Sequence, residues 1–287
     1  MIDRNIVDIM LMQYDTFTAA EKKIVDYVLG HQKESQYMSI TELSAACSVA
    51  ISTVSVFCRK LKLAGFNDFK IELARANIIT ARPNVFAAEN MDIQNGDTAG
   101  DVMQKTFNRN QETLRRTAHM LDEHEVARAV ELIDKAHQVV CLGQGNHAAI
   151  AMAAWGQFAT ISPKFKVMED SQLQMVALAT LTKDDVVLYF SYSGANLEIM
   201  DAVQVIREVG AKLILVTRFL HSPAAEFADV LLVYGAEEKP LQYGSADVLI
   251  SQLYIVDVLK SCYCMRNLED AERYREFIGK VLARKHL

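Results

Sequence analysis

Two serines and a glycine stand where an apolar run meets a helical pattern. The run Val186–Phe190 is followed at once by Ser191, Ser193 and Gly194, and Asn196 stands where the helical spacing begins. A helix N-terminus offers unpaired backbone N–H groups and a partial positive charge, and serine hydroxyls add further donors. This arrangement predicts a cradle for an anion, and phosphate is the anion that suits it best. The alternative is that Ser193 or Asn196 only caps the helix.

A second loop of the same kind lies earlier in the chain. In the stretch CLGQGNH, a strand-like run ends at Leu142, and Gly143 and Gly145 form a tight turn that leads through Asn146 and His147 into another helical pattern. The turn lacks the third glycine of the dinucleotide-binding fingerprint, because position 148 is alanine. A lone Gly-x-Gly is a weak signal, but two such loops on neighbouring strands would strengthen each other.

A third group of polar side chains shares one face of a helical stretch near the N-terminus. Between residues 52 and 64 the apolar side chains of Val54, Phe57 and Leu61 lie on a common face. The other face carries mainly hydroxyls and cations: Ser52, Thr53, Ser55, Val56, Arg59 and Lys60. Short hydroxyl side chains at the start of such a helix suit base edges and phosphates, and Arg59 and Lys60 suit phosphates. A solvated helix face is the alternative.

The elements that must position the two loops form an alternating pattern. Five short, nearly continuous apolar runs occupy residues 138–143, 164–168, 185–191, 211–217 and 228–234. Helical patterns occupy residues 148–158, 171–180, 196–209 and 245–266. Apolar runs without alternation indicate strands buried on both faces, as in a parallel sheet that helices cover. In such sheets ligands bind beyond the carboxyl ends of the strands, where both loops fall.

The N-terminal part has the pattern of several short helices. Thr18–Glu21 and Ser39–Glu42 have the spacing of capping boxes, and Gly30 ends the first of these helices. A third helix is expected from residue 51 or 52, with Gly65 as its end, and Asn67 is expected to cap a fourth. The pattern then fades over residues 81–100, which indicates a linker. Helices over residues 101–121 and 123–136 are expected to bridge into the second domain.

Composition narrows the class of protein. The chain has 287 residues, 51% of them hydrophobic and 23% charged, which indicates an ordinary globular protein. The N-terminus does not have the pattern of a signal peptide, and no apolar run is expected to be long enough to cross a membrane. Five scattered cysteines without a CxxC pair indicate reduced cytosolic thiols and no zinc site. The pattern predicts no metal and no cofactor.

Charge is unevenly distributed along the chain. Residues 1–80 hold nine basic and nine acidic side chains, so the net charge of −6 falls entirely on the remainder. Within the neutral part, basic residues cluster between Arg59 and Arg75. A locally basic element on an acidic protein is compatible with nucleic-acid binding, although a solvated helix can look the same.

The region from 125 to 265 resembles the sugar isomerase (SIS) domain, a phosphosugar-binding module with a five-stranded parallel sheet. The hallmark of that domain is Ser-x-Ser-Gly followed by a polar residue. The resemblance implies that Ser191, Ser193 and Asn196 hold a phosphate, and that residues 143–147 line the sugar side. Asn196 stands where the family commonly has threonine, and His147 stands where it commonly has serine.

Residues 39–74 resemble the helix-turn-helix of the ribose-phosphate-isomerase-regulator (RpiR) family, whose members join that domain to an SIS domain. Val56 stands where the family often has arginine. Valine can contact only a thymine methyl group, so this departure would change which base is read.

These observations predict two domains: an all-α helix-turn-helix domain over 1–80, a linker and bridging helix over 81–124, and an α/β domain with a five-stranded parallel sheet flanked by helices over 125–287. The predicted function is a cytoplasmic regulator of carbohydrate metabolism that binds a double-stranded DNA operator and a sugar-phosphate effector. A homodimer or higher homo-oligomer is expected, because one recognition helix makes few base contacts; the apolar helix over 245–266 is the candidate pairing surface. The predicted effector site comprises Gly143, Gly145, Asn146, His147, Ser191, Tyr192, Ser193, Gly194 and Asn196.

Two other functions remain open at this point. The first is a phosphosugar isomerase with an appended helical domain, which would need a base beside the sugar. His147 and Glu198 are the candidates for that base, and a turnover assay would discriminate. The second is an adaptor that binds a sugar phosphate without DNA, which would show no salt-dependent affinity for DNA.

Overall fold

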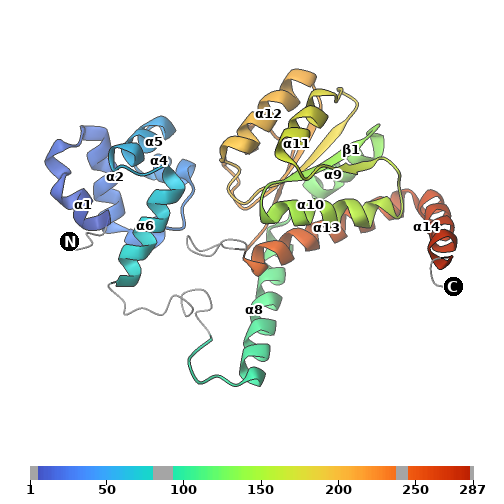
Figure 1. Ribbon diagram of the computed structural model, residues 1–287, viewed down its shortest axis with the longest axis horizontal. Helices are drawn as coiled ribbons and strands as arrows, with labels where there is room; N and C mark the ends of the chain where they lie inside the picture. The colour runs from blue at the N-terminus through green and yellow to red at the C-terminus, as the bar shows by residue number, and fades with distance from the viewer. Residues whose placement is uncertain (1–5, 80–92, 237–244, 285–287) are drawn as a thin grey trace. The chain divides into compact units, whose positions relative to one another are not determined.

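The computed structural model describes residues 6–79, 93–236 and 245–284. The chain divides into two compact units. The first covers the described residues up to Arg109 together with Ser245, and the second runs from Asn110 to Ala236 and from Ala246 onward (Figure 1). The division falls within helix α8 (Ala99–Met120). The two units are described separately below.

The first unit is helical and has its own apolar core. Its elements are α1 (Ile6–Met12), η1 (Tyr14–Thr16), α2 (Ala19–Gly30), α3 (Gln32–Ser35), α4 (Ile40–Ala46), α5 (Ile51–Lys60) and α6 (Phe66–Ile79). Val54, Phe57 and Phe69 are fully buried between these helices. Both predicted capping boxes are present, because the Thr18 and Ser39 hydroxyls accept from the backbone N–H three residues on and are matched by reciprocal glutamates.

Two helix boundaries in this unit differ from the sequence analysis. Helix α5 ends at Lys60, so Gly65 is not its terminator; Lys62 takes the left-handed conformation instead, with a φ of 63°. Helix α6 begins at Phe66, so Asn67 lies inside the helix and does not cap it. The carboxylate of Asp68 accepts a hydrogen bond from the backbone N–H of Ala64 at 3.0 Å and so orders the entry to α6.

The second unit contains the predicted parallel sheet. Its strands are β1 (Val139–Gly143), β2 (Phe165–Val167), β3 (Val186–Phe190), β4 (Lys212–Thr217) and β5 (Val230–Val233), in the spatial order β2-β1-β3-β4-β5. All four strand pairs are parallel. Its helical elements are α9 (Glu123–Lys135), α10 (Asn146–Ala159), α11 (Ser171–Ala179), α12 (Leu197–Val209), η2 (Ala225–Phe227), α13 (Ala246–Arg266) and α14 (Leu268–Ala283).

Helices cover both faces of this sheet, as the continuous apolar runs predicted. Alternate strand side chains such as Leu188 and Ile214 pack with α9, α10 and α13, whereas Val187 and Leu215 face the opposite side with α11 and α12. Figure 1 shows α11 and α12 on one side of the strands and α10 and α13 on the other. In this three-layer arrangement both faces of the sheet are buried, so the sequences of its strands are nearly continuous apolar runs.

Helix α13 corrects one sequence expectation. It is long and apolar enough, by length and composition, to cross a membrane, although the sequence analysis expected no such run. Its apolar character is explained by packing: Val248, Ile255, Val256, Leu259 and Tyr263 are buried in the core of the second unit. All five cysteine thiols of the chain are free.

Candidate functional site

The order of the strands brings the two predicted loops together. From β1 the chain passes outward to β2, and it then returns to place β3 on the other side of β1. Gly143, the last residue of β1, pairs in register with Phe190, the last residue of β3. The loops that follow these two residues therefore start side by side, at the point where the strand order reverses. Such switch points are where open α/β sheets bind ligands.

The loop after β3 is ordered by its own serines. Ser191 Oγ accepts a hydrogen bond from the backbone N–H of Gly194 at 3.0 Å, and Ser193 Oγ accepts one from Ala195 at 3.3 Å. Asn196 is the N-cap residue of α12, but its side chain makes no capping bond. Its buried Oδ1 atom has no hydrogen-bond partner among the described residues. Neither Ser193 nor Asn196 caps α12 through its side chain, so simple capping does not account for these residues.

Two glycines in these loops are required by close packing. A Cβ atom at position 194 would lie 2.3 Å from Ser222 Oγ, and the φ of Gly194 is 58°. A Cβ atom at position 143 would lie 2.6 Å from the carbonyl oxygen of His147. Gly194 is required because the side chain of Ser222 fills the space that a Cβ atom would need.

The loop after β1 leads directly into α10. Gly145 is the N-cap residue, with a φ of 57°, and Gly145 and Asn146 are exposed. His147 Nδ1 lies 3.0 Å from Gln252 Oε1, and because that oxygen only accepts, the Nδ1 atom must carry the proton. The predicted residues of this loop therefore lie at the mouth of the switch point, and His147 is anchored to α13.

A chain of polar groups connects the two loops beneath the site. Gln252 Nε2 donates to the Tyr234 hydroxyl at 3.1 Å, and that hydroxyl donates to the Ser191 carbonyl oxygen at 3.4 Å. Together with the His147–Gln252 bond, this network joins the β1 loop, α13, the end of β5 and the β3 loop. Tyr234 and Gln252 are fully buried, so the network holds backbone positions at the site.

Sequence reasoning missed the contribution of other strand ends. Thr217, the last residue of β4, donates its hydroxyl proton to the Tyr192 carbonyl oxygen at 2.9 Å, and the backbone N–H of Arg218 donates to the same oxygen at 3.1 Å. Gln174 of α11 donates to the Gly143 carbonyl oxygen at 3.2 Å. The signal that could have found Thr217 is its place at the end of the next apolar run, because carboxyl ends of parallel strands meet at one edge.

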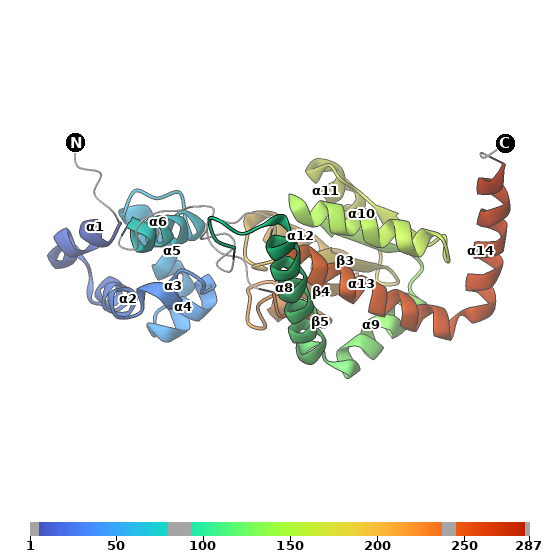
Figure 2. The same cartoon turned by 90° about the horizontal axis from the view of Figure 1, so that it is seen from below.

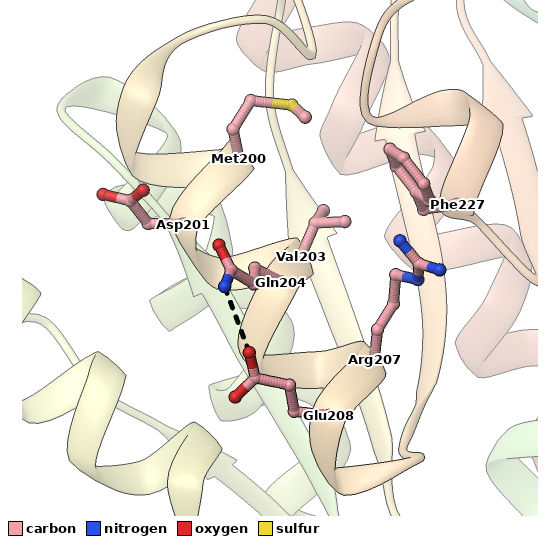
Figure 3. A pocket seen from close by; sticks show the side chains of 7 residues that line it. All are labelled: Met200, Asp201, Val203, Gln204, Arg207, Glu208 and Phe227. Atoms are coloured by element: carbon pink, nitrogen blue, oxygen red, sulfur yellow. Dashed lines mark hydrogen bonds between the residues drawn. The ribbon is translucent and has the colours of Figure 1, made fainter.

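A separate pocket of about 620 Å³ lies on the outer side of α12. Figure 3 shows its side chains, with Arg207 beside the ring of Phe227 and Gln204 bonded to Glu208. The Arg207 guanidinium carbon lies 4.7 Å from the centre of that ring. None of the predicted effector residues lines this pocket, so it is not the site that the sequence indicated.

In the first unit, α4 and α5 have the geometry of a helix-turn-helix. Their axes are bent by 102° across residues 47–50, within the usual range for this motif. Ser48 takes a φ of 51° in the turn. Val54 and Phe57 are buried, while Ser52 and Arg59 are exposed and the side chain of Val56 is 55% exposed. Helix α5 thus presents the predicted face to solvent.

Two of the predicted DNA-contacting residues also have partners inside the unit. Ser55 Oγ donates to the Ile51 carbonyl oxygen at 3.2 Å. Lys60 Nζ lies 2.8 Å from Glu21 Oε2 and donates to the Thr16 carbonyl oxygen at 2.9 Å. Burial alone would raise the pKa of Glu21, but hydrogen bonds from Lys60 and from Thr18 outweigh it and lower the pKa below its usual value. Lys60 therefore ties α5 to the start of α2.

Comparison with known proteins identifies both units. The sequence pattern of the helix-turn-helix domain of the rpiR family matches residues 4–77, and that of the SIS domain matches residues 132–261. An HTH-type transcriptional regulator of Caldanaerobacter subterraneus is 30% identical over 276 residues, which cover 95% of each chain. HexR of Escherichia coli strain K12 is 26% identical over 277 residues, which cover 96% of this chain and 93% of HexR.

Solved structures share the fold. NanR of Vibrio vulnificus, complexed with ManNAc-6P, has a TM-score of 0.83 at 21% identity and covers 97% of this chain and 98% of its own. The sugar isomerase domain of an RpiR transcription factor from Sphaerobacter thermophilus has a TM-score of 0.56 at 22% identity, covering 62% of this chain and 98% of its own.

These matches define a two-domain class in which a DNA-binding helix-turn-helix is joined to an SIS domain. The chain belongs to the RpiR family of HTH-type transcriptional regulators. Its named relatives are regulators, and the chain is a regulator rather than an enzyme.

Proposed function

We propose that the SIS domain binds a phosphorylated sugar at the carboxyl ends of β1 and β3, and that this effector alters DNA binding by the helix-turn-helix domain. The observation that carries the proposal is the meeting of two helix N-termini at one switch point, since α10 and α12 both begin in loops that follow neighbouring strands. Each helix N-terminus carries a partial positive charge, and the two lie at the same edge of the sheet. The complex of NanR with ManNAc-6P supports a ligand of this class.

The phosphate is assigned to the loop after β3. The Ser191 and Ser193 hydroxyls accept bonds from the loop backbone, and within the described chain neither hydroxyl donates to another group. Both hydroxyl protons are therefore available to phosphate oxygens. The Asn196 amide and the backbone of Gly194 complete the set, with Tyr192 beside them.

The sugar is assigned to the loop after β1. Gly145 and Asn146 are exposed there, Gly143 brings the first turn of α10 close to the strand, and His147 is oriented by Gln252. In this proposal His147 donates to or packs against the sugar.

On the DNA side, the proposed contacts are those of the exposed face of α5: Ser52, Thr53, Ser55, Val56, Arg59 and Lys60. We place Arg59 on a backbone phosphate and Val56 against a base edge, where valine can read only a thymine methyl group. A homodimer would present two such helices to an operator with two half-sites. The regulator is proposed to act in the cytoplasm on genes of carbohydrate metabolism.

The proposal can be tested with a thermal-shift screen. Phosphorylated hexoses, pentoses and amino sugars, ManNAc-6P among them, are added to the full chain, with the unphosphorylated sugars as controls. A ligand at a hundredfold excess over its Kd should stabilise the folded protein by about 2.7 kcal/mol. Stabilisation by a phosphorylated sugar but not by its parent sugar is expected. If no sugar phosphate shifts the transition, the proposed effector class is wrong.

The site itself is tested by replacing both serines. Each hydrogen bond to a charged group is worth about 1.5–3 kcal/mol, so Ser191→Ala with Ser193→Ala should weaken effector binding about a hundredfold or more. The exposed Ser261→Ala, on α13, is the matched control and should leave binding unchanged. Affinity is measured by calorimetry with the sugar phosphate found in the screen. Wild-type affinity in the double variant would mean that the phosphate is held elsewhere.

A further inference from the structure

Helix α8 is fixed to the SIS domain at one buried threonine. Thr117 is fully buried, and its Oγ1 atom accepts a hydrogen bond from the backbone N–H of Gly235 at 3.2 Å. The same atom lies 2.9 Å from Ser251 Oγ and 2.9 Å from the carbonyl oxygen of Thr113. One hydroxyl therefore joins α8 to the residues that follow β5 and to α13. Figures 1 and 2 show α8 beside the start of α13.

Backbone packs directly on backbone at this contact. A Cβ atom at position 235 would lie 2.6 Å from Arg116 Cβ and 2.8 Å from the carbonyl carbon of Arg116. Glycine is therefore required at position 235, because any side chain would push α8 away from the chain that follows β5. Close-packed contacts of this kind transmit displacement, so a shift of Gly235 is passed to α8.

The residue before Gly235 is bonded to both loops of the proposed effector site. The Tyr234 hydroxyl donates to the Ser191 carbonyl oxygen at 3.4 Å, in the loop after β3. It accepts from Gln252 Nε2 at 3.1 Å, and Gln252 Oε1 bonds to His147 in the loop after β1. A change at either loop therefore reaches Tyr234.

Two pairs of adjacent residues thus connect the proposed effector site to α8. In the first pair Tyr234 contacts the site and Gly235 contacts Thr117; in the second, Gln252 contacts the site and Ser251 contacts Thr117. All five residues are buried. Buried polar networks whose members are all bonded hold their parts in fixed positions, so both routes end on the same hydroxyl of α8 without slack.

We propose that α8 carries the effector signal out of the SIS domain, and that its contact with Gly235 and Thr117 is the point at which the signal enters the helix. Occupation of the switch point fixes the two loops to which the Tyr234 network is bonded, and this changes the position of α8 against the SIS domain. The inference rests on the proposed function, because it presupposes that an effector at the switch point alters DNA binding.

The course of α8 along the chain supports this role. The helix is continuous from Ala99 to Met120, and the division between the two units falls after Arg109. At 1.5 Å per residue, Thr117 lies about 12 Å along the helix from that division. A hydrogen-bonded helix is stiff over this length, so a displacement at Thr117 is carried into the part of α8 that belongs to the first unit.

The first test is the coupling factor, which is the ratio of the Kd for DNA with and without a saturating phosphorylated sugar. The sugar is the one with the largest thermal shift in the screen, and the DNA is selected by the full chain from a random library. Coupling factors are typically about 5 to 150. Thr117→Val keeps the shape of the side chain and removes the hydroxyl, and it should lower the factor about two- to tenfold, the value of one hydrogen bond.

Thr113→Val is the matched control for this change. Thr113 is a buried threonine one turn earlier in α8, and its hydroxyl bonds to no described residue. The control should leave the coupling factor within about twofold of the wild type. In both variants the affinity of the DNA-free protein for the sugar phosphate should stay within about threefold, which separates lost coupling from damage to the site.

Gly235→Ala gives a second and stronger test, because the added carbon meets the backbone of α8. It should bring the coupling factor to within about twofold of one. Gly156→Ala is the control, since Gly156 is exposed on α10 and has no atom within 4 Å of the added carbon. If Gly235→Ala does not fold, as circular dichroism would show, the Thr117 and Thr113 variants decide.

Tyr234→Phe breaks the same connection at its other end. Combined with Thr117→Val, it should lower the coupling factor no further than the larger of the two single changes, whereas independent contributions would multiply. Losses that multiply, or wild-type coupling in folded Thr117→Val, would overturn the role of α8 and leave the proposed function standing. A coupling factor of one in the wild-type chain would instead overturn the proposed function, and this inference with it.

Discussion

The loop at residues 191–196 and the helix α5 are built in opposite ways. Ser191 is 6% exposed. Its hydroxyl accepts from the Gly194 N–H, its own N–H donates to the Val216 carbonyl oxygen, and its carbonyl oxygen accepts from the Tyr234 hydroxyl. On α5, the side chain of Val56 is 55% exposed and Arg59 is exposed. In the proposed function, a phosphate at this loop is held by backbone N–H groups and by hydroxyls, whose positions packing must fix. A DNA duplex is contacted by side chains that a rigid helix displays. Changes that disturb the backbone should therefore harm folding at the first region, whereas changes of exposed side chains on α5 should harm DNA binding.

The largest expected effect is at Gly194. Gly194→Ala places a Cβ atom 2.3 Å from Ser222 Oγ at a φ of 58°. The left-handed conformation costs about 1–2 kcal/mol for a residue with a side chain, and overpacking adds about 1–3 kcal/mol. The free energy of unfolding of the SIS domain should fall by about 2–5 kcal/mol. Urea unfolding followed by the fluorescence of Trp155, the only tryptophan, measures it.

Gly145→Ala separates the two causes, because Gly145 has a similar φ of 57° but no atom within 4 Å of the added carbon. Gly145→Ala should lower the free energy of unfolding only by the cost of the left-handed conformation, about 1–2 kcal/mol. Ser222→Gly should recover much of the loss in Gly194→Ala. Equal losses at Gly145 and Gly194 would show that crowding by Ser222 is unimportant.

The comparison is sharpened by Lys60, a proposed DNA contact whose side chain also bonds to Glu21 and Thr16 within the unit. Lys60→Met leaves the buried Glu21 carboxylate without its cation and should destabilise the helix-turn-helix domain by about 1–3 kcal/mol. Hydrogen exchange in α2 and α5 would report this loss. Unchanged protection of both helices would mean that the ion pair contributes little.

The same variant should change the pH dependence of stability. The folded-state pKa of Glu21 is lowered, so its contribution is present above the unfolded pKa of about 4.3 and is lost as the pH falls through the folded value. In Lys60→Met, only the hydrogen bonds from Thr18 would oppose the effect of burial, so the folded-state pKa of Glu21 should rise. Acidification below pH 5 should therefore destabilise the wild-type domain more than it destabilises Lys60→Met.

A smaller effect is expected for the network under the proposed effector site. Tyr234→Phe removes the hydroxyl that accepts from Gln252 and donates to the Ser191 carbonyl oxygen. The loss should be about 0.5–1.5 kcal/mol in the stability of the SIS domain, the usual value of one hydrogen bond. Trp155 fluorescence measures the loss, and calorimetry would show whether effector affinity falls with it. Val233→Ala, at the partly exposed end of β5, is a control that leaves the network intact.

The smallest effect on stability is expected for Arg59→Ala, within about 0.5 kcal/mol, because the side chain is exposed. Its effect should be on binding instead. DNA affinity should fall for operator and scrambled sequences alike, and the slope of log affinity against log salt should drop by about one. DNA selected from a random library supplies the operator. An unchanged slope would exclude Arg59 from phosphate contact.

Local signals in the sequence located the five strands and several of the helices, but gave no bounds for α1, α3 or α14. The capping boxes at Thr18 and Ser39 located two helix starts, because the bonds that form them join residues three apart. The apolar runs located all five strands of the sheet for a similar reason, since burial on both faces leaves few polar positions in a run; the exposed ones are Lys166 in β2 and Lys212 at the start of β4. Helix ends were predicted less well. The sequence analysis ended α5 at Gly65, whereas the helix ends at Lys60 and Lys62 takes the left-handed conformation.

The sequence by itself determined that Ser191, Ser193 and Gly194 follow a buried strand and precede a helix, which was enough to indicate an anion cradle. Only the tertiary structure decided that the loop after Gly143 lies beside it, because that depends on β1 pairing with β3. The tertiary structure also brought Ser222, Tyr234 and Gln252 to the same loops. Such contacts join residues far apart in the chain, and their partners are chosen by strand order and packing, which no local spacing encodes.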